Sequence, residues 1–159
     1  METIGGNIFE LDPGLNFQSS RLREFYRMWD TKRAGREMPA RRDFDPLEFG
    51  ALLGFVSLTG VSYVGDLPRF RYRLIGTSIT QVVGRDASGR WLDEIYSADA
   101  YRKVVVGFEW ILKHRRPIRA KGTLRHANRD WLAVELIDAP LSSDGRQIDM
   151  FISCLEFTN

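Results

Sequence analysis

The sequence is poor in the residues that form covalent or metal cross-links. Its 159 residues include one cysteine, Cys154, and two histidines, His114 and His126. A lone cysteine cannot form an internal disulfide or a site of several thiolates. Two histidines far apart in the chain, without a cysteine pair, do not indicate a zinc site. We therefore expect neither an internal disulfide nor a bound metal ion.

Long apolar runs are missing too. None approaches the roughly 18 residues that a transmembrane helix needs, so we expect no membrane span. Residues 1–14 carry acidic rather than basic residues and no long apolar stretch, which does not fit a secretory signal peptide. These absences predict a cytoplasmic location.

The sequence also lacks the motifs of common enzyme classes. It has no glycine-rich phosphate loop, and neither histidine has a spacing that indicates a general base beside Cys154. We expect Cys154 to be a buried structural thiol, with a redox sensor as the alternative. No catalytic residues are expected, and a small enzyme is the least favoured alternative.

The composition is that of one folded domain, with 43% hydrophobic and 28% charged residues. Basic residues are unusual in kind, because 19 of the 23 are Arg. They concentrate in residues 21–42 and 113–129. Such segments can attract an anionic ligand or an acidic partner, or they can be ordinary solvated faces.

The N-terminal part predicts one amphipathic helix. We interpret residues 1–18 as a flexible arm, with a short strand at residues 7–11 as the alternative for that part, and residues 19–44 as a helix with its linker. An apolar stripe with i, i+3, i+4 and i+7 spacing runs along residues 20–34, and Ser20 is the expected N-cap. The stripe consists of Leu22, Phe25, Tyr26 and Trp29.

Residues 45–159 read as a core of strands and helices. Asp45-Pro46-Leu47-Glu48 predicts a short helix with a capping box. A hairpin follows, whose second strand places Phe70, Tyr72 and Leu74 opposite Arg69, Arg71 and Arg73. Short helical turns, a long helix from Ser97 to before Pro117, and three strands complete the order. The strands are expected at about 117–127, 130–139 and 147–157.

This order predicts an α+β fold. We expect a five-stranded antiparallel sheet with short helices and one longer helix on one face. The N-terminal amphipathic helix is expected on the other face, because strand 131–138 is apolar on both of its sides.

Four segments resemble a bacterial PAS domain family that is common in alphaproteobacteria, and they occur in the order of that family. The resemblance covers residues 20–157 and implies a PAS fold for the core. The segments are Leu22–Tyr26 with Trp29 and residues 36–40, Pro68–Thr77, Gly84–Asp86 with Gly89–Asp93, and Pro140–Ser142 with residues 144–150.

The resemblance implies a sensory or interaction module. PAS domains commonly bind a small molecule between the sheet and the long helix, in a concave and mostly apolar pocket. For His126 the alternative is a strand-end residue that hydrogen bonds to backbone. The expected pocket residues are Tyr72, Leu74, Trp91, Phe108, Leu112, Leu124 and His126.

Two familiar PAS cofactors are not expected. Flavin adduct chemistry needs a reactive cysteine just after a turn that here reads Gly84-Arg85-Asp86-Ala87, where there is none. Haem needs an axial ligand, usually a histidine on or near the long helix. His114 fits better as a cation at a helix C-terminus.

The resemblance also implies surfaces for partners. PAS domains commonly dimerise through an N-terminal helix, so we expect a homodimer formed by the apolar stripe of residues 20–34. Two basic rows are expected on the two edge strands, where they either prevent edge aggregation or bind an acidic protein. Nucleic acid is not favoured, because the aromatic residues point away from the arginines. The rows are Arg69, Arg71 and Arg73, and Arg119, Lys121 and Arg125. Within these 159 residues we expect no effector domain, so a signal would leave through a surface.

Overall fold

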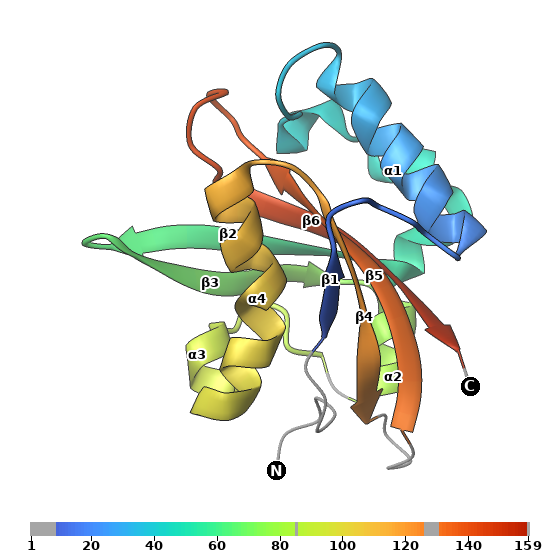
Figure 1. The fold of residues 1–159 in the computed structure, drawn as a ribbon, viewed down its shortest axis with the longest axis vertical. Helices are drawn as coiled ribbons and strands as arrows, with labels where there is room; N and C mark the ends of the chain where they lie inside the picture. The colour runs from blue at the N-terminus through green and yellow to red at the C-terminus, as the bar shows by residue number, and fades with distance from the viewer. Residues whose placement is uncertain (1–8, 85, 126–130, 159) are drawn as a thin grey trace.

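The computed structural model describes residues 9–84, 86–125 and 131–158, and its centre is one antiparallel sheet. The strand order is β1-β4-β5-β6-β2-β3 (Figure 1). The prediction of an α+β PAS fold is confirmed, with six strands in place of five. The strands are β1 Glu10–Asp12, β2 Val56–Val64, β3 Leu67–Ile75, β4 Ile118–Arg125, β5 Trp131–Leu141 and β6 Met150–Thr158.

Helices cover both faces of the sheet. On one face α4 packs against β4 and β5, and on the other α1 packs against β5 and β6 (Figure 1). We call these the inner and the outer face. No helix in the described part of the chain is both long and apolar enough to cross a bilayer. The helices are α1 Ser20–Arg33, the 3-10 helices η1 Arg41–Asp43 and η2 Pro46–Phe55, α2 Thr77–Val83, α3 Leu92–Ile95 and α4 Ala98–His114.

The additional strand is β1, which lies within the predicted flexible arm. It pairs with β4, where Leu11 lies opposite Ala120. Just before it, the ring of Phe9 packs on Gly122, in space that any side chain at position 122 would fill. The expectation that β4 is an edge strand is therefore wrong, because β1 covers that edge.

The apolar stripe of α1 is buried against the sheet of its own chain. Leu22, Phe25 and Trp29 are at most 3% exposed, whereas Tyr26 is only partly buried. The indole Nε1 of Trp29 donates a hydrogen bond of 3.0 Å to the carbonyl oxygen of Pro140 in β5. The N-cap is Ser19 rather than the expected Ser20, and its hydroxyl accepts from the backbone N–H of Leu22.

The predicted capping signals are also confirmed at η2 and α4. Asp45 and Glu48 form the predicted capping box of η2, which is a 3-10 helix and is kinked at Gly50, where φ is 53°. Ser97 caps α4 by accepting a hydrogen bond from the backbone of Ala100. The helix ends with Arg115 in the left-handed conformation, before Pro117 as expected.

Candidate functional site

A row of polar side chains crosses the inner face of the sheet. Ser57 of β2 lies directly opposite Ser153 of β6, and Ser153 lies directly opposite Asp138 of β5. Residues that face each other across neighbouring strands project to the same side of a sheet. All three are less than 9% exposed, so the row lies in the interior, beneath α4.

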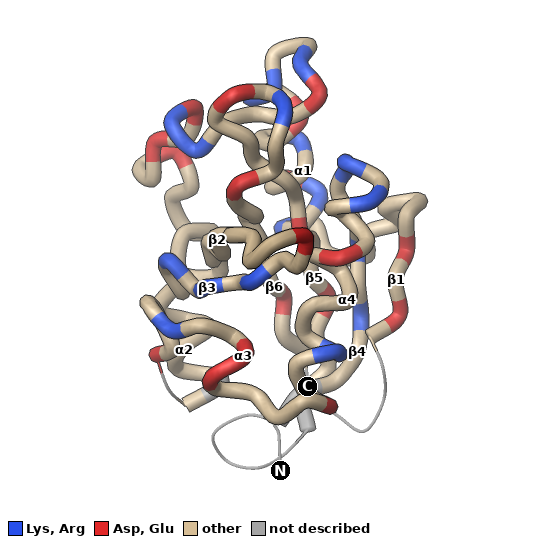
Figure 2. Tube along the Cα trace, turned by 90° about the vertical axis from the view of Figure 1, so that its left-hand side faces the viewer, with Lys and Arg blue, Asp and Glu red and all other residues tan. Residues whose placement is uncertain are grey.

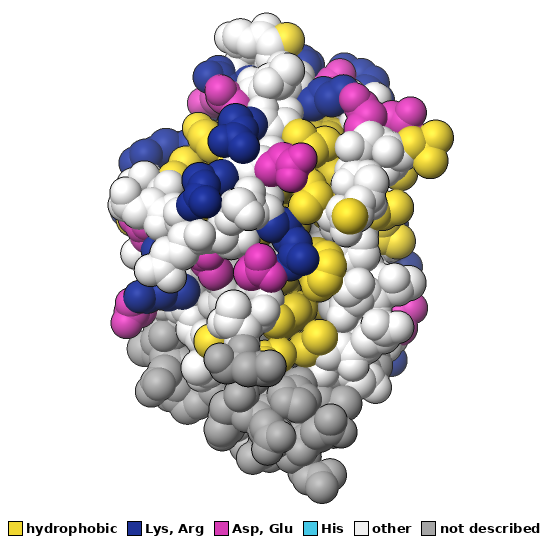
Figure 3. Space-filling model, turned by 90° about the vertical axis from the view of Figure 1, so that its right-hand side faces the viewer, with side chains coloured by type: hydrophobic (Ala, Val, Ile, Leu, Met, Phe, Trp, Pro, Cys, Tyr) yellow, Lys and Arg dark blue, Asp and Glu magenta, His cyan; other side chains and the backbone are white. Residues whose placement is uncertain are grey.

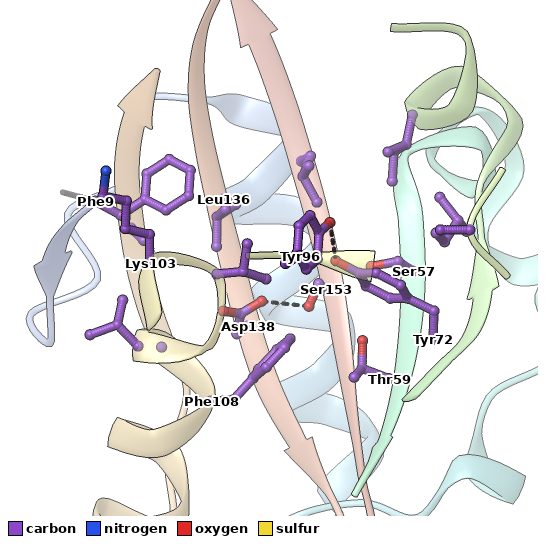
Figure 4. A pocket seen from close by; sticks show the side chains of 18 of the residues that line it. Phe9, Ser57, Thr59, Tyr72, Tyr96, Lys103, Phe108, Leu136, Asp138 and Ser153 are labelled. Atoms are coloured by element: carbon purple, nitrogen blue, oxygen red, sulfur yellow. Dashed lines mark hydrogen bonds between the residues drawn. The ribbon is translucent and has the colours of Figure 1, made fainter. Parts of the chain in front are cut away.

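Asp138 is the most unusual member of this row. The hydroxyl of Ser153 donates to its Oδ1 at 2.5 Å (Figure 4), and in the described part of the chain this is the only hydrogen bond to the carboxyl. Burial raises the pKa of Asp138 to about 6, and the bond from Ser153 offsets part of that increase. The carboxyl therefore changes charge close to neutral pH.

Thr59 lies two residues along β2 from Ser57 and faces the same way. It is 1% exposed, and its Oγ1 has no hydrogen-bond partner among the described residues. A buried hydroxyl without a partner costs about 1–3 kcal/mol, so such groups are rare unless something else satisfies them. The hydroxyl of Thr59, which lines the cavity described next, is therefore able to hydrogen bond to a molecule there.

A cavity of about 150 Å³ lies over these polar residues, between the inner face and α4 (Figure 4). Phe108 of α4 forms part of its wall and stacks on Phe151 of β6 at 4.5 Å between ring centroids. The rest of the lining is mainly apolar and includes Phe9, Leu11, Ile75, Ile79, Ala87, Val104, Ala120, Leu136 and Leu155.

Three further polar side chains lie around the cavity. The hydroxyls of Tyr72 and Tyr96 are 3.0 Å apart and hydrogen bond to each other (Figure 4). Lys103 of α4 also lines the cavity, and its Nζ lies 3.3 Å from a carboxylate oxygen of Asp99. A mostly apolar pocket with a few convergent polar groups is the usual form of a small-molecule site.

A family model for the PAS domain matches residues 17–156. The chain belongs to the PAS domain family. None of the curated proteins matches it. The match covers α1, α4, strands β2 to β5 and most of β6, and it includes every described lining residue of the cavity except Phe9 and Leu11.

The structure brings two of the seven predicted pocket residues of this PAS domain to the cavity, Tyr72 and Phe108. Leu74 points away and is 44% exposed. The cause is an irregularity in the pairing of β2 with β3, where Leu58 faces Leu74 but the next residue, Thr59, faces Tyr72. Such a bulge inserts one residue and reverses the alternation, so Ile75 lines the cavity in place of Leu74.

The other predicted pocket residues lie elsewhere. Trp91 is partly buried beneath Arg69, whose guanidinium lies 4.1 Å from the centre of the ring. Leu112 packs against the main core and does not line the cavity. The side chain of Leu124 and the whole of His126 lie outside the described residues.

The basic rows are mostly engaged within the PAS domain. Arg69 pairs with Asp93 at 2.8 Å, and Arg71 donates to the carbonyl of Gly89 at 3.0 Å. Arg119, expected on a free edge, is 6% exposed and pairs with Glu135 at 2.6 Å. Basic and acidic residues are interspersed along the chain in Figure 2. Arg73 and Lys121 are exposed, and the side chain of Arg125 is not among those described.

Neither of the two residues weighed for cofactors, Cys154 and His114, lines the cavity. Cys154 belongs to β6, is fully buried in the core beneath α1, and has its thiol pKa raised to about 12 by burial. His114 is exposed and stacks on Trp110, 4.2 Å between ring centroids. Among the described residues, no group of three His, Cys, Asp or Glu side chains could hold a metal ion.

Sequence reasoning missed the polar row altogether. One signal was present, because Asp138 follows Leu132, Val134 and Leu136 at every second position of an apolar strand face. Serine and threonine on strands carry no such signal. Their meeting with Asp138 depends on the register of strands that are far apart in sequence.

Proposed function

We propose that this PAS domain is a sensory or signalling module that binds a small ligand in the cavity between the sheet and α4. The observation that carries the proposal is the buried Oγ1 of Thr59, which has no partner among the described residues and lines the same cavity as the buried carboxyl of Asp138. A core selected for packing alone would place apolar side chains here, since unsatisfied polar groups destabilise it.

The size of the cavity limits the ligand. A volume of about 150 Å³ corresponds to a molecule about as large as benzene. The apolar lining favours a ligand with an apolar body, and the polar row favours one hydrogen-bonding group on it. A large cofactor of the kind that some PAS domains carry would not fit in this volume.

We propose that the module acts by binding and not by catalysis. No histidine or cysteine is among the described residues that line the cavity, so a nucleophile with a histidine base is not supported there. Cytoplasmic location remains part of the proposal and follows from the sequence alone.

The signal is proposed to leave through β1 and α4, which form two walls of the cavity. Phe9 and Leu11 come from the N-terminal segment, whereas Val104 and Phe108 come from α4. A ligand that fills the cavity would press on both elements. Because β1 is only three residues long, its pairing with β4 is the most easily displaced part of the sheet.

A homodimer formed by α1 remains a prediction, but the structure limits the ways in which such a dimer could form. The apolar stripe of α1 is already buried within the chain. A dimer through that stripe would need exchange of α1 between two copies, while a dimer without exchange would use the polar outer side of α1. On the face seen in Figure 3, hydrophobic side chains form a strip with charged side chains beside it. Light scattering over a range of protein concentrations distinguishes monomer from dimer.

The alternative function is a ligand-free adaptor that docks an acidic protein on its basic surface. Arg73 and Lys121 are the suitable probes, because both are exposed and the only ion pair that either forms among the described residues is the long one of Lys121 with Glu10, at 3.9 Å. Arg69 and Arg119 are not, since their replacement would break internal ion pairs. Loss of an acidic partner in pull-downs with Arg73→Glu or Lys121→Glu would favour this function, and unchanged capture would remove it.

The decisive test is native mass spectrometry of the protein purified from its own host. We expect a small bound molecule that Ala120→Leu displaces, because Ala120 lines the cavity and the larger side chain would fill it. Ala51→Leu is the matched control, since Ala51 is exposed on η2. A bound molecule that survives Ala120→Leu would contradict the proposed site.

A further inference from the structure

We propose that the cavity recognises a one-ring molecule that carries a hydrogen-bond donor, preferably a protonated amine, and that Asp138 is the residue that receives this donor. The inference rests on the proposed function, and it adds the chemical class of the ligand. It follows from counting the donors and acceptors that remain at the cavity floor.

Acceptors are in excess around Asp138, because the hydroxyl of Ser57 is separated from it by Ser153. The single hydroxyl proton of Ser153 is already donated to Oδ1 of Asp138. Ser153 can therefore only accept further hydrogen bonds, and an ionised carboxylate can only accept. Oδ2 of Asp138 lies on the side of Gly107, where a β-carbon would be 2.6 Å from it. The missing side chain at position 107 leaves this oxygen close to the helix backbone.

Thr59 adds a group that can adapt to the ligand. Its hydroxyl can donate or accept, and it has no partner among the described residues. Thr59 and Asp138 lie on strands that flank β6, so both face the cavity from its floor. Because β6 separates the two residues, Thr59 can hydrogen bond to a second polar group of a ligand but not to the donor held by Asp138.

The other charged and titratable groups of the described lining have partners of their own, so Asp138 is the group that a cationic ligand would meet. Lys103, from α4, lies near a carboxylate of Asp99, and the hydroxyls of Tyr72 and Tyr96 bond to each other. Asp138 is the only carboxylate among the described lining residues. A ligand carboxylate would meet Asp138 as a like charge, whereas a ligand ammonium would meet it as a charge-assisted partner.

The protonation of Asp138 gives the recognition a pH dependence. Its pKa of about 6 means that the carboxyl is mostly neutral at pH 5 and mostly ionised above pH 7. An ammonium ligand should bind more tightly as the pH rises through this range. A neutral ligand of the same shape should not follow this trend.

Four probes of matched shape test the inference by calorimetry or by NMR titration. They are benzylamine, benzyl alcohol, toluene and benzoate. We expect benzylamine to bind most tightly, benzyl alcohol more weakly, and benzoate most weakly. Asp138→Asn should weaken benzylamine roughly ten-fold or more and leave toluene almost unchanged, because only benzylamine forms the charge-assisted bond.

Thr59→Val is the second variant, and it keeps the shape of the side chain while removing the hydroxyl. It should leave the binding of benzylamine, benzyl alcohol and toluene almost unchanged, because β6 separates Thr59 from Asp138. The melting temperature and the circular dichroism spectrum of each variant show that a loss of binding is not a loss of folding.

The outcomes separate the inference from the proposed function. Binding of benzoate or toluene as tight as that of benzylamine, or benzylamine binding that Asp138→Asn leaves intact, overturns the donor class while ligand binding in the cavity stands. Failure of all four probes overturns the inference. Failure of all four probes with no host molecule in native mass spectrometry also removes the proposed function.

Discussion

Gly107 of α4 lies directly against Asp138 of β5, so that a β-carbon at position 107 would be 2.6 Å from the carboxylate Oδ2. The buried carboxyl and the absence of a side chain on the helix are thus one structural feature. The absence of a side chain at position 107 lets α4 approach the polar row while the carboxyl of Asp138 remains beneath the helix.

Gly107→Ala should therefore destabilise the protein, although alanine is the better helix former. The helical gain is about 1 kcal/mol, whereas forcing an extra methyl into a packed site costs about 1–3 kcal/mol. We expect a net loss in the free energy of unfolding by urea. In an Asp138→Ser background the same substitution should be neutral or stabilising, and equal losses in both backgrounds would contradict the contact.

The stability of the protein should depend on pH through Asp138. Its pKa rises from 3.8 in an ordinary carboxyl to about 6 in the folded state. The folded state then binds more protons than the unfolded state between these values, so stability falls as the pH rises through them. The loss is about 3 kcal/mol for a shift of this size. Asp138→Asn should remove it.

Asp43→Asn is the control for that experiment, because the shift there has the opposite sign. The backbone N–H of Ala40 and the side chain of Arg36 hold the pKa of Asp43 below its usual value. The contribution of Asp43 is therefore present at neutral pH and lost on acidification. Urea unfolding between about pH 2 and pH 7 measures both variants, because the contribution of Asp43 is lost only below its ordinary pKa of 3.8. Parallel curves for Asp138→Asn and wild type would refute the assignment.

Glu135 should be important for the attachment of α1. Its carboxylate accepts from the backbone N–H groups of Gln18 and Ser19, and from Arg119 at 2.6 Å. Burial opposes ionisation of Glu135, but these hydrogen bonds outweigh it and keep the pKa low. Glu135→Ala would leave Arg119 buried with one partner fewer, and we expect a loss of about 3 kcal/mol. Glu156→Ala is a milder comparison, since its partner Arg21 is more exposed.

Cys154 should not react with thiol reagents in the native protein. Burial raises the pKa of its thiol to about 12, and the side chain is fully buried. The thiolate, which is the reactive form, is then nearly absent at neutral pH. We expect labelling only at the rate of unfolding, as followed by mass spectrometry with and without urea. Rapid native labelling would support the redox-sensor alternative.

Local signals account for the elements that sequence reasoning placed correctly. The stripe of α1, the capping box of Asp45 and Glu48, and the stop of α4 before Pro117 each depend on residues within a few positions of one another. The same reasoning failed for Leu74, because the bulge opposite Leu58 and Thr59 depends on how two strands pair. Arg119 was misplaced for a similar reason, since β1 comes from more than a hundred residues earlier.

The sequence by itself indicated the PAS family through the resemblance of four short motifs. It also predicted the order of helices and strands from α1 onward and the two apolar faces of the sheet, because periodicity and capping act over short distances. Only the tertiary structure decided the candidate site. Ser57, Asp138 and Ser153 meet because three strands pair in one register, and a shift by one residue would turn each side chain to the opposite face. The cavity above them exists because α4 approaches at Gly107 and β1 closes the side of β4.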